Sequence, residues 1–185
     1  MNSVKKHQHA HERCEGMKLY YDEMSSPVGP LMLIINEDNI ALRIDFGTKK
    51  DLDKKINHWL KRYLGEPVLI HNPDKLKAIK EELDAYFTKE SQVFTFKYKF
   101  YGTDFQKQVW EALFMIPYGE TKTYKDIATI INNPKAVRAV GGAVNKNPFS
   151  IVAPCHRVIG MNGKMVGYGG GLDKKEFLLK HENYT

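Results

Sequence analysis

The stretch TYKDIATIINNPKAVRAVGGAVNKN, residues 123–147, decides how the C-terminal half of this chain folds. Thr123 is a favoured N-cap residue for a short helix. A second helix is expected to start at once, with Asn133 as its N-cap and Pro134 at its first position. Two short helices joined by a tight turn predict a helix-turn-helix.

The second helix contains two adjacent glycines, Gly141 and Gly142, which cost a helix interior about 2 kcal/mol relative to alanine. Something must therefore approach this backbone closely. One interpretation is tight packing against another helix. The other is a nucleic-acid backbone that lies against the helix, with Arg138 and Lys146 nearby to meet its phosphates.

The distribution of charge favours the second interpretation. The net charge is +6, but residues 1–90 carry 15 basic and 15 acidic side chains, whereas residues 91–185 carry 13 and 7. The whole positive excess therefore lies in the C-terminal half. It indicates a polyanionic partner, most simply nucleic acid, because neutralising phosphates releases counterions.

The composition limits the class of protein. A chain of 185 residues with 42% hydrophobic content can bury a real core. Its two cysteines, Cys14 and Cys155, are too few for a disulfide framework and indicate a reducing compartment, cytoplasmic or nuclear. The first 18 residues lack the apolar segment of a signal peptide, and no later run is long enough to span a membrane. We therefore expect a soluble protein.

The N-terminal half has the pattern of a small α+β unit. Its expected elements are three strands of an antiparallel sheet at residues 17–24, 29–38 and 39–46, and amphipathic helices at 51–64 and 73–87. No catalytic motif occurs in this half. We therefore expect a scaffold domain at residues 17–92, preceded by a flexible tail at 1–16.

The C-terminal half, residues 93–185, is expected to be a separate and mostly helical domain. A connecting strand at residues 93–100 leads to a helix whose start carries a capping box formed by Thr103 and Gln106. The apolar spacing of this helix predicts one buried face made of Phe105, Val109, Trp110, Leu113 and Phe114.

One cysteine lies in the apolar stretch IVAPCHRVIG, residues 151–160. Cys155 is either an inert buried side chain or a nucleophile, with His156 as its base and Arg157 as a charge that lowers the thiol pKa. Neighbouring residues of a strand point to opposite faces. Thiol and imidazole can therefore cooperate only if the backbone turns at Pro154 or a water bridges them.

Three segments carry a close resemblance to a known family: PCHRVIG, RAVGGAVNKNP before it and GYGGGLDKKEFLLKHE after it. They resemble the active-site region of the O6-alkylguanine-DNA alkyltransferases, also called methylated-DNA–protein-cysteine methyltransferases. The resemblance runs from Thr103 to Glu182. It implies an α+β fold with a winged-helix-like helix-turn-helix. It also implies a monomer, without cofactor or metal, that repairs double-stranded DNA by direct reversal.

The implied reaction takes place on Cys155. An O6-alkylguanine, or an O4-alkylthymine, is flipped out of the duplex, and its alkyl group passes irreversibly to the sulfur, once per molecule. The resemblance makes His156 the base, reached through a water, and Glu182 the acid that orients it. Asn147 would hold the turn before the cysteine.

The resemblance also implies how DNA and the base are held. Tyr124 would lie beside the target nucleotide, and Arg138 would fill the space that the flipped base leaves. Gly141, Gly142 and Lys146 are the remaining implied DNA contacts. The implied base pocket consists of Tyr168, Gly169, Val158 and Ser150. Lys175 would lie beside that pocket, and both Lys175 and Tyr124 would have a catalytic role.

Some interpretations stay open. Ser150 stands where some members have proline, so the sequence does not set the preference for bulky adducts. The segment HQHAHERC, residues 7–14, has no scaffold that would enforce tetrahedral zinc geometry, so we expect no metal. GYGGGL lacks the lysine of a phosphate-binding loop. The alternative functions are a cysteine hydrolase and a non-enzymatic DNA-damage binder built on the helix-turn-helix.

Overall fold

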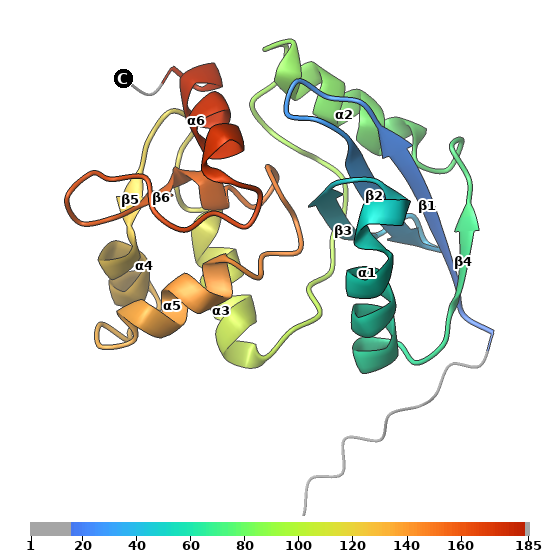
Figure 1. Cartoon of the computed structure of the whole chain (residues 1–185), viewed down its shortest axis with the longest axis horizontal. Coiled ribbons are helices and arrows are strands. Elements are labelled where there is room, and N and C mark those ends of the chain that lie inside the picture. Colours follow the sequence, from blue (N-terminus) through green and yellow to red (C-terminus); the bar gives the residue numbers. More distant parts are fainter. Residues whose placement is uncertain (1–15, 184–185) are drawn as a thin grey trace, which may run out of the picture.

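The computed structural model describes residues 16–183 and shows two halves that lie side by side (Figure 1). The tail predicted at residues 1–16 and the histidine-rich segment around Cys14 lie outside the described residues, apart from Gly16. Within residues 16–183, no helix is both long and apolar enough to cross a membrane.

A four-stranded sheet forms the N-terminal half, with the strand order β3-β2-β1-β4. The predicted strands are β1 (Lys18–Met24), β2 (Leu31–Asn36) and β3 (Ala41–Phe46), and they pair antiparallel. The fourth strand, β4 (Val68–His71), pairs parallel with β1 and corrects the predicted three-stranded sheet. Its four residues are exposed or half-buried, so they lack the alternation that identifies a strand in a sequence.

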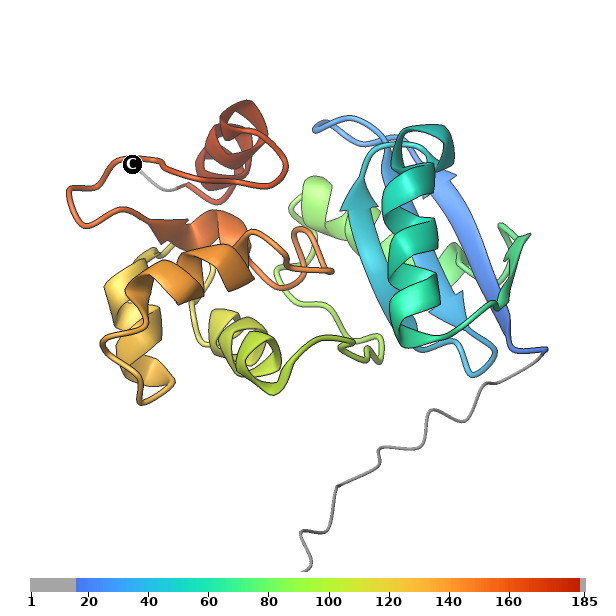
Figure 2. The same ribbon diagram turned by 60° about the horizontal axis from the view of Figure 1, so that its bottom comes forward.

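Helices cover both faces of this sheet (Figure 2). Met32 and Ile34 pack with α1 (Lys49–Tyr63), whereas Leu33 and Ile35 share a second apolar cluster with α2 (Lys77–Phe87). Neighbouring residues of a strand point to opposite faces, so both sets are buried only when both faces are covered. The second cluster continues into the C-terminal half of the chain.

The C-terminal half is mostly helical, which confirms the α+β fold class. Its elements are α3 (Asp104–Leu113), β5 (Lys122–Thr123), α4 (Tyr124–Ile130), α5 (Val137–Val144), β6 (Val158–Ile159) and α6 (Leu172–His181). The capping box of Thr103 and Gln106 is present, and Thr123 caps α4 as predicted. Of the predicted buried face of α3, Val109, Trp110 and Leu113 are buried and Phe105 is half-buried. Phe114 is 37% exposed, because it lies past the last turn of the helix.

Helices α4 and α5 form the predicted helix-turn-helix, but α5 starts later than predicted. Asn133 and Pro134 lie in the turn, and Ala136 is the N-cap. The reason is the way α4 ends. Asn132 adopts the left-handed region with φ 55°, and the N–H of Asn133 donates to the carbonyl of Ala128 at 2.8 Å. This Schellman-type ending occupies the residues that were expected to start α5.

The two halves are joined along the free edge of β3. The N–H of Ile44 donates to the carbonyl of Pro148, and its carbonyl accepts from the N–H of Ser150, both at 2.9 Å. The segment that leads to the cysteine is therefore held by the N-terminal sheet.

The linker at residues 93–100 is not the predicted strand. Only Tyr98 pairs with the sheet, as an isolated bridge to Ala41. Its alternating aromatic residues pack instead on the shared core, since Phe94 and Phe96 contact that cluster and Phe100 is part of it. The strand-like alternation thus reflects packing rather than pairing.

Candidate active site

A tight turn brings the cysteine to the junction of the two halves. The Nδ2 of Asn147 donates to the carbonyls of Phe149 at 3.1 Å and Ala153 at 2.7 Å, and its Oδ1 accepts from the N–H of Phe149 at 3.0 Å. Within the turn, Ile151 has a φ of 74°, which is costly for a β-branched side chain. The buried amide of Asn147 therefore maintains a backbone that local preference disfavours.

The cysteine itself begins a single 3-10 turn. This turn covers Cys155–Arg157 and starts directly after Pro154. The structure therefore confirms that the backbone turns at Pro154. Strand geometry does not apply here, so it does not force the side chains of Cys155 and His156 onto opposite faces.

A small cavity of about 70 Å³ reaches the Cys155 side chain, which is 6% exposed. Both halves of the chain contribute to its walls. The lining includes Asn147, Ser150, Tyr168 and Gly169 from the C-terminal half and Phe46 and Lys55 from the N-terminal half. Val158 is not among the described lining residues, because it lies fully buried in β6.

The thiol of Cys155 is protonated at rest. Burial raises its pKa, although the Asn147 amide, the Tyr168 hydroxyl and the Lys175 charge act in the opposite direction. The expected net lowering of this pKa by Arg157 is wrong, because burial outweighs the charges nearby and Arg157 is bound to Glu182. The nucleophile therefore needs a base.

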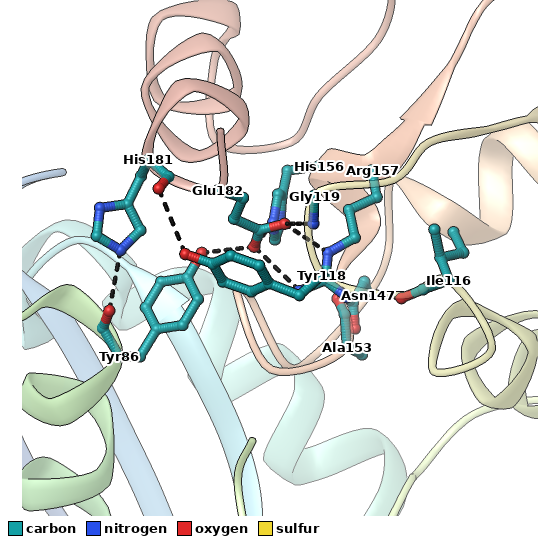
Figure 3. A network of polar contacts seen from close by, with 10 residues as sticks. All are labelled: Tyr86, Ile116, Tyr118, Gly119, Asn147, Ala153, His156, Arg157, His181 and Glu182. Atoms are coloured by element: carbon teal, nitrogen blue, oxygen red, sulfur yellow. Dashed lines mark hydrogen bonds and ion pairs between the residues drawn. The ribbon is translucent and has the colours of Figure 1, made fainter. Parts of the chain in front are cut away.

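A buried ion pair stands behind that base (Figure 3). Oε1 of Glu182 lies 2.7 Å from Nε2 of His156, and Arg157 donates to the same carboxylate from Nε at 2.7 Å and Nη2 at 3.0 Å. Burial alone would raise the pKa of Glu182, but the hydrogen bonds and charges of His156 and Arg157 hold it far below its ordinary value. Glu182 is therefore ionised.

This ionised carboxylate fixes the tautomer of His156. A carboxylate only accepts hydrogen bonds, so Nε2 carries the proton and Nδ1 keeps its lone pair. Nδ1 is buried and has no hydrogen-bond partner among the described protein groups. Burial lowers the pKa of His156 and outweighs the opposite effect of Glu182. The residue that follows the protonated thiol in the chain is thus a neutral imidazole with a free lone pair, the state that a general base needs.

Two further side chains hold the loop that follows β6. Nζ of Lys175 donates to the carbonyls of Val158 at 2.5 Å and Val166 at 3.3 Å. Burial lowers the pKa of Lys175 to about 8. The Tyr124 hydroxyl donates to the carbonyls of Val166 at 3.0 Å and Gly167 at 3.1 Å. Both side chains therefore tie this loop to the core beside the cavity.

The outer face of α5 is exposed and carries a basic side chain near each end. Its exposed residues are Arg138, Ala139, Gly142, Asn145 and Lys146. A Cβ placed on Gly142 would meet nothing within 4 Å, and one on Gly141 would meet only the ring of Tyr124 at 3.9 Å. Tight packing within the protein is therefore not the reason for the paired glycines.

Two family models together match nearly the whole described chain. The DNA binding domain of 6-O-methylguanine DNA methyltransferase matches residues 104–184, and its ribonuclease-like domain matches residues 19–100. The chain belongs to this methyltransferase family. The predicted family and enzyme class, a methylated-DNA–protein-cysteine methyltransferase, are thereby confirmed.

Similar proteins agree with this assignment. The methylated-DNA–protein-cysteine methyltransferase of Methanosarcina barkeri is 46% identical over 164 residues, covering 89% of this chain and 97% of the relative. The crystal structure of Mycobacterium tuberculosis O6-methylguanine methyltransferase has 38% identity and a TM-score of 0.75, covering 89% of this chain and 92% of that one. A structure of the same organism's protein in complex with DNA has 37% identity and a TM-score of 0.74, covering 88% and 92%.

In this methyltransferase, the predicted site residues fall into three places. Asn147, Cys155, His156 and Glu182 form the buried centre, while Tyr168, Gly169 and Ser150 line the cavity. Tyr124 and Lys175 bind the adjacent loop, and Val158 supplies a carbonyl to Lys175. Arg138, Gly141, Gly142 and Lys146 belong to α5 or directly follow it.

The methyltransferase site also contains residues that sequence reasoning missed. The hydroxyl of Tyr86 and the N–H of Gly119 donate to Glu182, at 2.7 Å and 3.3 Å (Figure 3). Phe46 and Lys55 line the cavity. No local motif marks any of them, because each belongs to a segment far along the chain from the cysteine and only the fold brings it there.

Proposed function

We propose that this methyltransferase repairs double-stranded DNA by moving the alkyl group of O6-alkylguanine, and of O4-alkylthymine, onto Cys155. The observation that carries the proposal is a buried thiol that borders a cavity and is followed in the chain by neutral His156, whose Nε2 is 2.7 Å from Glu182. The bond between the alkyl carbon and the base oxygen breaks, and a carbon–sulfur bond forms. A thioether is not a leaving group under mild conditions, so each molecule acts once.

The proton movements follow from the tautomer of His156. Its Nδ1 takes the thiol proton through a bridging water, and Glu182 stabilises the imidazolium that results. The base oxygen leaves with developing negative charge and must gain a proton. Burial and the nearby Cys155 raise the pKa of Tyr124, so its hydroxyl stays protonated. It would donate that proton to the base oxygen by turning away from the carbonyls of Val166 and Gly167.

The target nucleotide must leave the duplex, because a stacked base cannot present its O6 carbon to a buried sulfur. We assign duplex binding to the outer face of α5. The backbone of Gly141 and Gly142 allows close approach, Lys146 contacts phosphate, and Arg138 fills the vacated stack. The DNA complex of the Mycobacterium tuberculosis relative supports DNA as the partner.

The two parts of the chain have different roles in this proposal. Residues 93–185 supply the DNA-binding surface and the alkyl acceptor, and residues 17–92 form a scaffold that also borders the cavity. The reaction needs no cofactor, since the thiol, its base and a proton donor are all side chains of this chain. A single copy contains all of these groups, so the protein acts as a monomer.

Mass spectrometry tests the acceptor. After mixing with a duplex that contains O6-methylguanine, the intact mass should rise by about 14 Da, on a peptide that contains Cys155. Cys155→Ser should bind the duplex and gain no mass, while Cys14→Ser should behave like the parent. Modification of Cys14, or repeated turnover without any mass change, would refute the assignment.

Two variants test the DNA interface. Arg138→Ala should slow repair in duplex DNA but leave reaction with free O6-methylguanine base nearly unchanged, because the free base needs no flipping. Lys146→Ala should weaken binding to every duplex. It should also reduce the slope of log binding constant against log salt concentration by about one unit. If both variants gave the Lys146 pattern, Arg138 would be an ordinary phosphate contact.

A further inference from the structure

The carboxylate of Glu182 receives hydrogen bonds from four residues that belong to three different segments (Figure 3). His156 and Arg157 approach from the 3-10 turn, and the N–H of Gly119 approaches from the loop after α3. The fourth donor is the hydroxyl of Tyr86, on α2 of the N-terminal half, at 2.7 Å from Oε1. A residue of the supposed scaffold thus touches the acid behind the catalytic base.

The surroundings of Tyr86 hold this donor in place. Its side chain is 1% exposed, and its ring packs against those of Phe87, Phe94, Tyr118 and His181. The backbone carbonyl of Tyr86 also accepts a hydrogen bond from Nε2 of His181 at 2.9 Å. His181 is the residue next to Glu182 in the chain. Burial and the Glu182 charge raise the Tyr86 pKa far above its ordinary value, so the hydroxyl stays a donor.

We propose that Tyr86 is a positioning residue for alkyl transfer, which acts through Glu182 on His156. This inference rests on the proposed function. Tyr86 does not touch the reacting atoms, and its hydroxyl shares one oxygen, Oε1, with Nε2 of His156 and Nη2 of Arg157. The N-terminal half therefore contributes to the chemistry as well as to the cavity wall.

Sharing that oxygen has two consequences. The Tyr86 hydroxyl holds Oε1 where His156 needs it, and it withdraws charge that would otherwise stabilise the imidazolium. Removing the hydroxyl should leave Oε1 less well placed, which slows proton transfer, and should leave more negative charge on it, which raises the pKa of His156. The titratable groups that face the pair are Arg157 on the 3-10 turn, Lys175 on α6, Tyr168 in the loop before α6, Tyr118 after α3 and Tyr86 on α2, and His181 binds the backbone of Tyr86.

Tyr86→Phe tests the proposal, because it removes one oxygen and keeps the ring. The matched control is Tyr118→Phe, in the same aromatic cluster, whose hydroxyl donates to the backbone carbonyl of His181 at 3.3 Å and not to the Glu182 carboxylate. Single-turnover transfer from a duplex containing O6-methylguanine is followed from pH 5 to 9, with duplex affinity and melting temperature measured in parallel.

Tyr86→Phe should slow transfer by about tenfold at neutral pH, with unchanged duplex affinity. The acid limb of its pH profile should move up by about half a unit, since His156 must be neutral to act. Tyr118→Phe should stay within about twofold of the parent, with no shift of the limb. A purely structural role of Tyr86 would lower the melting temperature and leave the acid limb in place, which would overturn the proposal.

A double variant separates action through Glu182 from action elsewhere. In the Glu182→Gln background, adding Tyr86→Phe should change the rate by less than about twofold, because the shared carboxylate is already lost. Fully multiplicative effects would place Tyr86 on another path and refute the inference. If the parent protein gained no alkyl group on Cys155, the proposed function itself would fail. Because that measurement uses only the parent protein, it is distinct from a failure of the inference about Tyr86.

Discussion

At the scale of single residues, the site depends on a carboxylate that stays charged in the interior. Glu182 is 1% exposed, yet its oxygens accept hydrogen bonds from Tyr86, Gly119, His156 and Arg157. Desolvation of an isolated carboxylate would cost several kcal/mol, and these donors offset that cost. The same bonds fix the tautomer of the base, so stability and chemistry share one set of contacts.

The pH dependence of stability tests this residue. The pKa of Glu182 is lowered from 4.5 in the folded chain, so its contribution is fully present above about pH 4.5 and is lost as the pH falls below it. Glu182→Gln should therefore flatten the acid side of the stability curve by up to about 1.4 kcal/mol per pH unit relative to the parent. Urea denaturation between pH 3 and 6 measures the difference.

The control for this experiment is Glu176→Gln, which removes a carboxylate from the exposed surface of α6. Asp22 and Asp45 also have lowered pKa values, but they are common to all three proteins and cancel in the comparison. Equal acid slopes for the parent and Glu182→Gln would contradict the assigned charge state.

Asn147 is the second residue on which the site depends. Asn147→Ala would remove three hydrogen bonds from the turn and leave the N–H of Phe149 buried without its partner, while Ile151 keeps its costly φ of 74°. The free energy of unfolding should fall by about 2 kcal/mol. Denaturant unfolding measures it, with the exposed neighbour Asn145→Ala as the control, and a loss below about 0.5 kcal/mol would contradict this account.

At the scale of elements, α5 combines poor helix propensity with an open outer face. Gly142 is exposed, and nothing in the described structure lies near its missing Cβ. A helix interior gains stability from alanine in place of glycine, so internal stability does not explain this residue. The explanation that we propose lies outside the protein, in the backbone of a bound duplex.

Gly142→Ala tests this explanation, because stability and binding should move in opposite directions. The variant should be more stable by about 0.5–1 kcal/mol, since the methyl group meets open space. Its affinity for duplex DNA should fall, because that methyl group stands where the DNA backbone approaches. Gly141→Ala is the comparison, since its Cβ would point toward Tyr124 rather than outward. A stabilised Gly142→Ala with parental affinity would exclude duplex contact at this position.

At the scale of the whole molecule, the two halves share the cavity that contains the thiol. The edge of β3 pairs with residues 148–150, and the ring of Phe46 lies against the backbone of Gly170 in the loop that carries Tyr168. A Cβ on Gly170 would come within 2.6 Å of that ring. The N-terminal half therefore sets the position of a pocket wall.

A double-variant cycle tests this contact. Gly170→Ala should lower the free energy of unfolding by about 1–3 kcal/mol and slow alkyl transfer, because the ring and the loop must move apart. Adding Phe46→Ala removes the closer of two clashes, because the Tyr168 ring also lies 2.9 Å from that Cβ. The destabilisation of the double variant should therefore be smaller than the sum of the two single values by at least about 0.5 kcal/mol. Thermal unfolding and single-turnover kinetics measure both, and strict additivity would show that the halves do not meet here.

The sequence alone determined the features that depend on short-range patterns. Short apolar runs with a hairpin-type turn between the second and third predicted β1 to β3. Capping boxes and N-caps predicted the starts of α3 and α4, and the PCHR motif identified Cys155 as the candidate nucleophile. These signals lie within a few residues of one another, so local sterics and hydrogen bonding are enough to express them.

Only the tertiary structure decided the features that depend on burial or on distant contacts. The thiol pKa is raised because the folded chain buries Cys155, and Arg157 binds Glu182 in that fold. Tyr86 reaches Glu182 across 96 residues of sequence, and β4 forms only because β1 offers it an edge. Desolvation and long-range hydrogen bonds exist only after the chain has folded, so no local pattern could have shown them.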